Sequence, residues 1–260
     1  NSFSRLFYIS GAVMRALKLK RRGVSVDVVT TQDPFEAGLA GYIIARIFNA
    51  CLHIQIHTDL MSPYFARESA LNRARVFLAK ILLPRASAVR VVSERIKKSI
   101  EHIACPHTPI DVLPIFVDTA DAEDFVAIKK KYPQFNKTLL VTSRLSPEKN
   151  IAMVIEAMRA VTKKYPATGL VIVGEGSELG HLRHLVKKYN LDVNVVFEGW
   201  RDNLAPYYNE ADALILASDY EGYGMVAVEA LSHGCPVIMT DVGCARDIVK
   251  DRQNGLVVPV

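Results

Sequence analysis

Hydrophobic positions along the chain form short apolar runs that alternate with longer segments of helical spacing. The short runs, which we expect to be buried strands, cover residues 24–30, 52–57, 89–92, 110–113, 138–142, 170–173, 193–197, 213–216 and 237–239. Helices are expected at 1–20, 34–48, 64–83, 177–189, 204–210 and 245–250, and from 94, 151 and 225 onward. Strands that alternate with helices predict parallel sheets with helices on their faces.

This alternation occurs in both halves of the chain, although the halves share no repeat in sequence. Between them, four of the seven residues from 118 to 124 are acidic, which is typical of a linker or boundary. A length of 260 residues is long for one domain and suits two. We therefore predict two doubly wound α/β domains, at 1–117 and 118–260.

The composition is that of a globular protein, with 50% hydrophobic and 23% charged residues. No apolar run reaches the roughly 18 residues of a spanning helix, and no secretory signal pattern stands at the start. The four cysteines are scattered, so reduced thiols in a cytoplasm are expected. The histidines show no metal-binding spacing, and no metal site is predicted. Because the chain does not begin with Met, we expect a fragment or a processed chain.

The net charge of +5 suits an anionic nucleotide or an anionic membrane surface as a partner. The densest basic cluster is Lys18, Lys20, Arg21 and Arg22, and a solvated helix end also explains it. No aromatic residues interleave with this cluster, which disfavours nucleic-acid binding. The pattern does not predict an oligomeric state.

The stretch 217–236 carries the strongest candidate chemistry. A turn at 220–224 contains Gly222 and Gly224, and a helix is expected to begin at Met225. Helix N-termini offer unpaired N–H groups and a positive dipole end, which suit a diphosphate. Glu221 and Glu229 lie eight residues apart, roughly 80° around the helix axis, and can face one cleft.

Other polar residues also follow predicted strands directly. His57, Arg144 with Lys149, Glu175 and Glu221 lie just past four different strands. Ligands of open parallel sheets bind beyond the carboxyl ends of the strands. Arg144 and Lys149 can clamp a diphosphate, whereas solvated loop cations are the alternative. A cleft between the two domains is the predicted active site.

These motifs together resemble those of retaining glycosyltransferase family 4. The resemblance rests on Glu221-x7-Glu229, on Ser143-Arg144-Leu145-Ser146-Pro147-Glu148-Lys149, and on Val173-Gly174-Glu175-Gly176, which occur in the family's order. It implies the GT-B fold, in which two Rossmann-like domains face a cleft. It also implies sugar transfer from a UDP- or GDP-sugar to an acceptor hydroxyl, with retained anomeric configuration and without a metal or other cofactor.

The resemblance assigns roles residue by residue. Arg144 and Lys149 would neutralise the leaving diphosphate, Glu221 would contact the transferred sugar, and His57 would reach the donor sugar across the cleft. The catalytic set it implies is His57, Arg144, Lys149 and Glu221. The donor-binding set is Arg144, Lys149, Gly174, Glu175, Gly176, Tyr223, Gly224, Met225 and Glu229, with Glu229 holding the ribose. Asp33 would line the cleft or shape the fold.

Two departures and two alternatives accompany this resemblance. Gly243-Cys244 and Asp247 stand where the family favours a Gly-Gly pair and a Glu. We expect both ends to be truncated, with an incomplete N-terminal domain and an incomplete C-terminal end. The alternatives are a nucleotide-sugar epimerase of GT-B fold and a non-catalytic nucleotide-binding fragment. The acceptor would be a sugar or a lipid-linked acceptor in glycan or glycolipid biosynthesis, and the protein would lie in the cytoplasm or peripherally at the inner membrane face.

Overall fold

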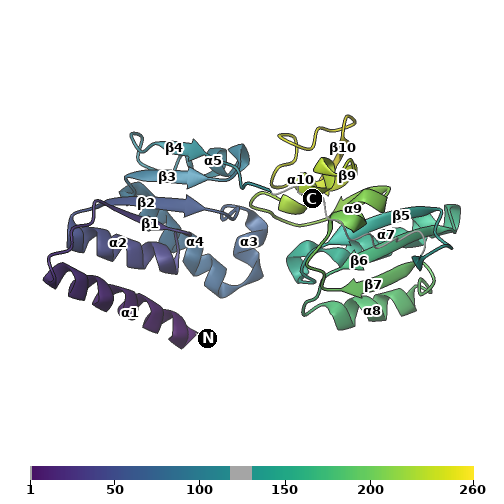
Figure 1. Ribbon diagram of the computed structural model, residues 1–260, viewed down its shortest axis with the longest axis horizontal. Helices are drawn as coiled ribbons and strands as arrows, with labels where there is room; N and C mark the ends of the chain where they lie inside the picture. The colour runs from purple at the N-terminus through teal and green to yellow at the C-terminus, as the bar shows by residue number, and fades with distance from the viewer. Residues whose placement is uncertain (1, 118–130) are drawn as a thin grey trace. The chain divides into compact units, whose positions relative to one another are not determined.

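The computed structural model describes residues 2–117 and 131–260, with side chains described from Tyr8 onward (Figure 1). The chain divides into two compact units, Asn1–Ile115 and Phe116–Val260. Each unit holds its own parallel sheet, so the expectation of two parallel α/β domains is confirmed. The acidic stretch 118–124, predicted to be a linker, lies outside the described residues.

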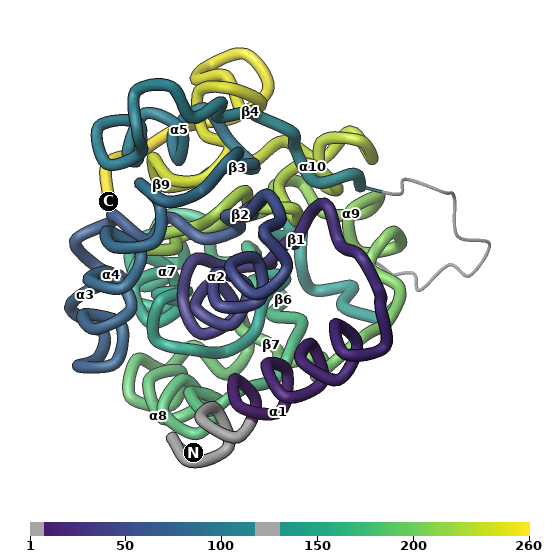
Figure 2. The backbone as a smooth tube through the Cα atoms, turned by 90° about the vertical axis from the view of Figure 1, so that its left-hand side faces the viewer, coloured from purple at the N-terminus to yellow at the C-terminus, as the bar shows by residue number. Residues whose placement is uncertain are grey.

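The first unit is a four-stranded parallel sheet of order β1-β2-β3-β4 with helices packed on it. The strands are β1 (Val28–Thr31), β2 (Cys51–Ile56), β3 (Ala88–Val91) and β4 (Ile110–Val112). The helices are α1 (Ser2–Arg21), α2 (Glu36–Phe48), α3 (Pro63–Glu68), α4 (Ala70–Leu82), the 3₁₀ turn η1 (Leu83–Arg85) and α5 (Glu94–Ile100). Helix α1 packs along α2, and α2 packs on β1 and β2 (Figure 2).

Two predicted elements of this unit are wrong in detail. The helix expected at 64–83 is two helices, because Ser69 between them is extended (φ −158°, ψ 157°). Its hydroxyl accepts a hydrogen bond from the Asn72 N–H at 3.0 Å and caps α4. The buried strand expected at 24–30 begins only at Val28, which is 58% exposed. The helix expected from 94 is present as α5, and the Ser93 hydroxyl caps it by accepting from the Ile96 N–H.

The second unit is a six-stranded parallel sheet of order β10-β9-β8-β5-β6-β7. Its strands are β5 (Lys137–Thr142), β6 (Thr168–Val173), β7 (Val195–Gly199), β8 (Ala213–Leu216), β9 (Val237–Thr240) and β10 (Gly255–Val258). Its helices are η2 (Pro147–Lys149, 3₁₀), α7 (Ile151–Lys164), α8 (Leu179–Lys188), α9 (Ala205–Glu210) and α10 (Met225–Ser232). Ile151, Val154, Ile155 and Met158 of α7 are buried, as their spacing predicts.

The end of the second unit differs from the prediction. Residues 245–250 are turns and not a helix, because Arg246 has φ 68° and a bridge joins Ala245 to Val249. Strand β10 was not predicted, since its residues alternate between half-buried and exposed and form no buried apolar run. It pairs in parallel with β9 at the edge of the sheet.

The strand order of the second unit creates a topological switch point. The chain adds β6 and β7 on one side of β5, then returns to add β8, β9 and β10 on the other side. The loops that leave β5 and β8 therefore diverge at neighbouring carboxyl ends. Open α/β sheets bind ligands at this place.

Candidate functional site

The loop that leaves β5, residues 143–150, carries both predicted cations. Arg144 is largely exposed, at 75% of its side chain, and lies 3.5 Å from Glu148. The Ser146 hydroxyl donates to the same Glu148 oxygen at 2.6 Å and holds it inside the loop. Lys149 ends the 3₁₀ turn, and its side chain is only 16% exposed. One cation therefore faces solvent, and the other is held inside the site.

An ion pair joins this loop to the one that leaves β8. Lys149 Nζ lies 2.5 Å from Glu221 Oε1, and the buried Ser218 hydroxyl donates to the same oxygen at 2.8 Å. The Glu221 side chain is 14% exposed. The Asn150 amide donates to Asp219 at 3.2 Å and further ties the two loops. The structure thus brings the predicted Lys149 and Glu221 together across the switch point.

Glu229 lies in the second turn of α10 and has a different partner. The buried Tyr208 hydroxyl donates to Glu229 Oε2 at 2.8 Å. Tyr208 also lies 3.1 Å from the Thr142 hydroxyl, at the end of β5. Lys149 and Ser218 orient one predicted carboxylate, and Tyr208 orients the other. Sequence analysis missed Tyr208 and Ser218, because a tyrosine in a short helix and a serine after a strand carry no motif.

The glycines after β6 permit close contact with the β5 loop. Gly174 has φ 137°, and a Cβ there would lie 1.9 Å from the Ser143 carbonyl oxygen. A Cβ at Gly176 would lie 2.2 Å from the Leu145 carbonyl oxygen. Glu175 between them is exposed. Both glycines are therefore required by backbone packing, whether or not they also contact a ligand.

The turn before α10 is supported by the loop that follows β9. Gly224 caps the helix in the left-handed conformation (φ 86°), and Met225 at the first helical position is 38% exposed. The buried Tyr223 accepts a backbone hydrogen bond from the Cys244 N–H at 2.7 Å. A Cβ at Gly243 would lie 2.5 Å from the Tyr223 carbonyl oxygen. In this chain, Gly243-Cys244 therefore shapes the turn.

His57 lies in the first unit, directly after β2. Its Nε2 is 3.3 Å from Gln55 Oε1, which also accepts from Arg90 at 3.0 Å. Burial and then the positive charge of Arg90 lower the pKa of His57, which favours the neutral imidazole. The Asp33 carboxylate accepts from the Phe35 N–H at 2.7 Å and shapes the turn into α2.

No group of three or more His, Cys, Asp or Glu side chains is placed to hold a metal within the ranges 2–117 and 131–260. In the same ranges, no helix has both the length and the apolar character needed to cross a bilayer. All four cysteines are free thiols.

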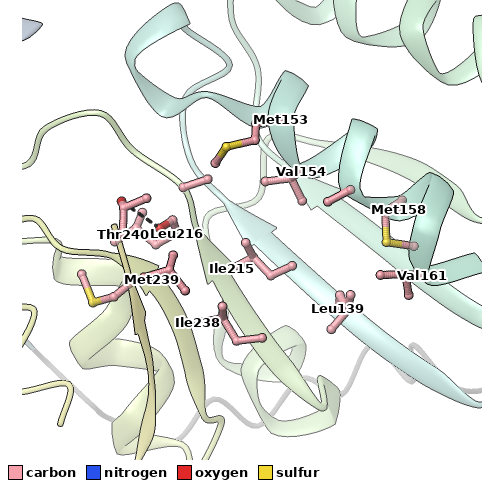
Figure 3. Close-up of a pocket in the computed structure, with 13 residues that line it drawn as sticks. Leu139, Met153, Val154, Met158, Val161, Ile215, Leu216, Ile238, Met239 and Thr240 are labelled. Atoms are coloured by element: carbon pink, nitrogen blue, oxygen red, sulfur yellow. Dashed lines mark hydrogen bonds between the residues drawn. The ribbon is translucent and has the colours of Figure 1, made fainter. Parts of the chain in front are cut away.

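A separate apolar groove of about 240 Å³ lies in the second unit between α7 and strands β8 and β9 (Figure 3). Met153, Met158, Ile215 and Ile238 line it, and its lining contains no charged side chain. A diphosphate requires cations or N–H donors. We therefore place the candidate site at the loops and not in this groove.

Two family descriptions match the chain. "Glycosyl transferases group 1" matches residues 124–260, and "Glycosyltransferase Family 4" matches residues 1–121. The first matches the unit that holds Lys149, Glu221 and Glu229.

The similar proteins include named enzymes and solved structures. Alpha-monoglucosyldiacylglycerol synthase of Streptococcus pneumoniae is 26% identical over 93% of this chain and 57% of its own length. The N-acetylgalactosamine-N,N'-diacetylbacillosaminyl-diphospho-undecaprenol 4-alpha-N-acetylgalactosaminyltransferase of Campylobacter jejuni is 28% identical over 94% of this chain and 67% of its own. Anabaena HepE, solved in complex with UDP, superposes with a TM-score of 0.78 at 21% identity, over 96% of this chain and 68% of that one. This chain spans about half the length, or less, of several curated relatives.

Proposed function

The chain belongs to the glycosyl transferases group 1 family, and from this premise we propose that the protein transfers a sugar from a nucleotide-sugar donor to an acceptor hydroxyl. The donor is a UDP- or GDP-sugar, the anomeric configuration is retained, and no metal or other cofactor takes part. The observation that carries the proposal is the Lys149–Glu221 pair at the switch point of the second unit. A cation for phosphate and a carboxylate for sugar hydroxyls stand there side by side.

The charges suit the departure of a nucleoside diphosphate. As the bond between the sugar C1 and the phosphate oxygen breaks, negative charge builds on that oxygen. Lys149, the exposed Arg144 and the N–H groups from Tyr223 to Met225 at the start of α10 stabilise this charge. Gly174 to Gly176 hold the neighbouring loop close to the β5 loop. These fixed groups favour the transition state over the bound donor.

The remaining roles concern the sugar and the ribose. Glu221 accepts hydrogen bonds from the transferred sugar, Glu229 accepts from the ribose, and His57 contacts the donor sugar as a neutral acceptor or donor. The acceptor oxygen bonds to C1 on the face that the diphosphate leaves. A phosphate oxygen takes the acceptor's proton, which balances the reaction without a covalent enzyme intermediate.

We propose a lipid or lipid-linked acceptor in glycan or glycolipid biosynthesis. The names of two relatives refer to a diacylglycerol and to a diphospho-undecaprenol, and both relatives align with more than nine-tenths of this chain. Such an acceptor requires contact with a membrane surface, which we place at the cytoplasmic face. The free thiols suit that compartment.

The outward face of α4 offers a second surface for this membrane contact, in addition to the basic cluster at 18–22. Phe77 is 67% exposed and Ile81, one turn later, is 37% exposed. Arg73 and Lys80 are exposed beside them, and no acidic residue occurs between 69 and 93. An apolar stripe flanked by cations is suited to an anionic lipid surface.

Turnover by the full-length protein tests the proposed activity. Incubating UDP- and GDP-sugars with a lipid extract should yield a glycosylated lipid and free nucleoside diphosphate, with chelator present. An epimerase would instead convert the donor's sugar with no acceptor present. A non-catalytic module would bind donor and release no diphosphate. Either result would overturn the transferase assignment.

A further inference from the structure

We infer that Tyr208 is a positioning residue that presents the Glu229 carboxylate to the nucleotide's ribose. The inference rests on the proposed function, because it assigns how one contact of that site is built. Tyr208 is 2% exposed, and its hydroxyl donates to Glu229 Oε2 at 2.8 Å. No motif pointed to this residue, and its partner lies 21 positions away in a different helix.

The direction of hydrogen bonding in this cluster can be assigned. Burial and then the charge of Glu229 raise the pKa of Tyr208, so the phenol keeps its proton. An ionised carboxylate only accepts, and Tyr208 must therefore donate its one proton to Glu229. The Thr142 hydroxyl at 3.1 Å then donates to the phenol oxygen. The chain of donation runs from Thr142 through Tyr208 to Glu229.

The phenol is itself held from several sides. The His233 ring stacks on it with centroids 5.9 Å apart and planes 24° apart. His233 Nδ1 lies 3.0 Å from Asn209 Oδ1, which keeps that ring in place. The Tyr208 N–H donates to the Leu204 carbonyl at 3.1 Å. Tyr208 is therefore a rigid support and not a mobile surface side chain.

This support connects Glu229 to the loop that carries the cations. Thr142 is the last residue of β5, directly before the loop that contains Arg144 and Lys149. A glutamate free on a helix surface loses rotamer entropy when it binds a ligand. The bond from Tyr208 orders Glu229 before the nucleotide arrives, which lowers that loss.

The arrangement also divides the work of the two carboxylate oxygens. Glu229 Oε2 accepts the hydrogen bond from Tyr208, whereas Glu229 Oε1 accepts no hydrogen bond within the described part of the chain. Glu229 therefore offers one oriented oxygen to a ribose hydroxyl. A hydrogen bond from a hydroxyl to a charged acceptor is strong, so the site should bind a nucleotide that lacks this ribose hydroxyl more weakly.

Nucleotide binding by Tyr208→Phe tests the inference. The affinities of UDP or GDP, whichever binds, and of its 2′-deoxy and 3′-deoxy analogues are measured by calorimetry. In the wild type, loss of the contacted hydroxyl should weaken binding about tenfold or more. In Tyr208→Phe we expect the parent nucleotide to bind about fivefold more weakly and the discrimination to fall to about threefold. Glu229→Ala should abolish the discrimination between the parent nucleotide and its deoxy analogue.

Tyr207→Phe is the matched control, since Tyr207 is the adjacent buried tyrosine and bonds to Glu198 and Arg201. It should leave the discrimination at the wild-type value. If Tyr208→Phe weakens all nucleotides equally and keeps the wild-type discrimination, Tyr208 is only structural and the inference is overturned while the proposed function stands. If the wild type binds neither UDP nor GDP, the proposed function fails and the inference with it.

Discussion

Glu221 is bound in the free protein by the same lysine that we assign to the diphosphate. Glu221→Ala removes the sugar contact and releases Lys149 for phosphate. Turnover of the full-length protein should fall roughly a hundredfold or more, the scale of a lost transition-state contact. Affinity for the free nucleoside diphosphate should be kept or increase. Steady-state kinetics and calorimetry check both, and unchanged turnover would remove Glu221 from the mechanism.

Arg144 is the exposed cation of the site, with its weak Glu148 contact at 3.5 Å. Arg144→Ala should weaken nucleoside diphosphate binding about tenfold, because a charge-assisted bond to phosphate is lost. Lys163→Ala, an exposed cation in the last turn of α7, is the matched control and should bind as the wild type does. Equal affinity of the two variants would place Arg144 outside the phosphate contacts.

At this scale, the sequence predicted several site residues but not the side chains that they contact. Lys149 and Glu221 were expected near one ligand, because both follow strands of a parallel sheet. Their direct pairing, across 72 positions, depends on β8 lying beside β5. Tyr208 escaped prediction because nothing in a spacing shows that a buried phenol reaches a carboxylate on another helix. Gly243-Cys244, which departs from the family's Gly-Gly pair, packs against Tyr223, a contact that the sequence pattern does not show.

Among the elements, β7 is held by a carboxylate that the motifs did not include. Glu198 is 2% exposed at its side chain and accepts from Lys131 at 2.6 Å and from Arg201 at 2.9 Å. The pairing register with β6 skips Glu198, so that Gly199 stands opposite Val173. The Gly199 carbonyl then accepts from the Gly174 N–H at 2.8 Å. The ion pairs of Glu198 thus support the loop of Gly174 to Gly176, which follows β6 in the candidate site.

Glu198→Gln should lower the free energy of unfolding by about 2 kcal/mol at neutral pH. The loss is no larger because the half-exposed Lys131 and Arg201 can turn to water when the carboxylate is removed. Hydrogen bonds from Lys131, Tyr132 and Arg201 outweigh burial and lower the pKa of Glu198 from 4.5 to about 2. A lowered pKa stabilises the fold above pH 4.5, and this stabilisation is lost as pH falls toward 2. The difference between wild type and variant should shrink over that window.

Urea unfolding at several pH values measures this difference. Glu156→Gln is the control, because Glu156 is exposed and only 3.7 Å from an exposed arginine. It should unfold as the wild type does at every pH. A Glu198→Gln variant as stable as the wild type at neutral pH would contradict the assigned role.

Element types were predictable where apolar spacing was strong, as in α7 and β8. Failures arose where one residue's backbone decided the outcome. Ser69 breaks a helix whose apolar pattern continues through it, and Arg246 in the left-handed region prevents one. Strand β10 depends on an edge of β9 that local sequence does not reveal.

At the scale of the whole molecule, the exposed apolar and basic side chains of α4 predict binding to anionic membranes. Full-length protein should sediment with phosphatidylglycerol vesicles and not with phosphatidylcholine vesicles. Arg73→Glu with Lys80→Glu should abolish sedimentation, and Phe77→Ser should weaken it several-fold. Lys163→Glu with Lys164→Glu, on α7 of the other unit, is the charge-matched control. Sedimentation unaffected by the α4 variants would contradict this surface.

Two domains were predictable from alternating strands and helices, whereas the strand order was not. The order β7-β6-β5-β8-β9-β10 requires β8 to return to β5, a tertiary choice that no local pattern encodes. That return is what places Lys149 beside Glu221. In the second unit the structure thus brings two of these residues, Lys149 and Glu221, into contact. The roles of the predicted site residues, including that of His57 across a cleft, stay predictions.

Calorimetric titration of the chain with UDP and GDP, with and without a chelator, tests the central claim most directly. We predict that one of the two nucleotides binds with a micromolar or lower dissociation constant. The chelator should leave this constant unchanged, and Arg144→Ala should raise it. Absence of binding by either nucleotide, or binding that requires a metal, would contradict the assignment of the switch-point loops as a metal-independent nucleotide-sugar site.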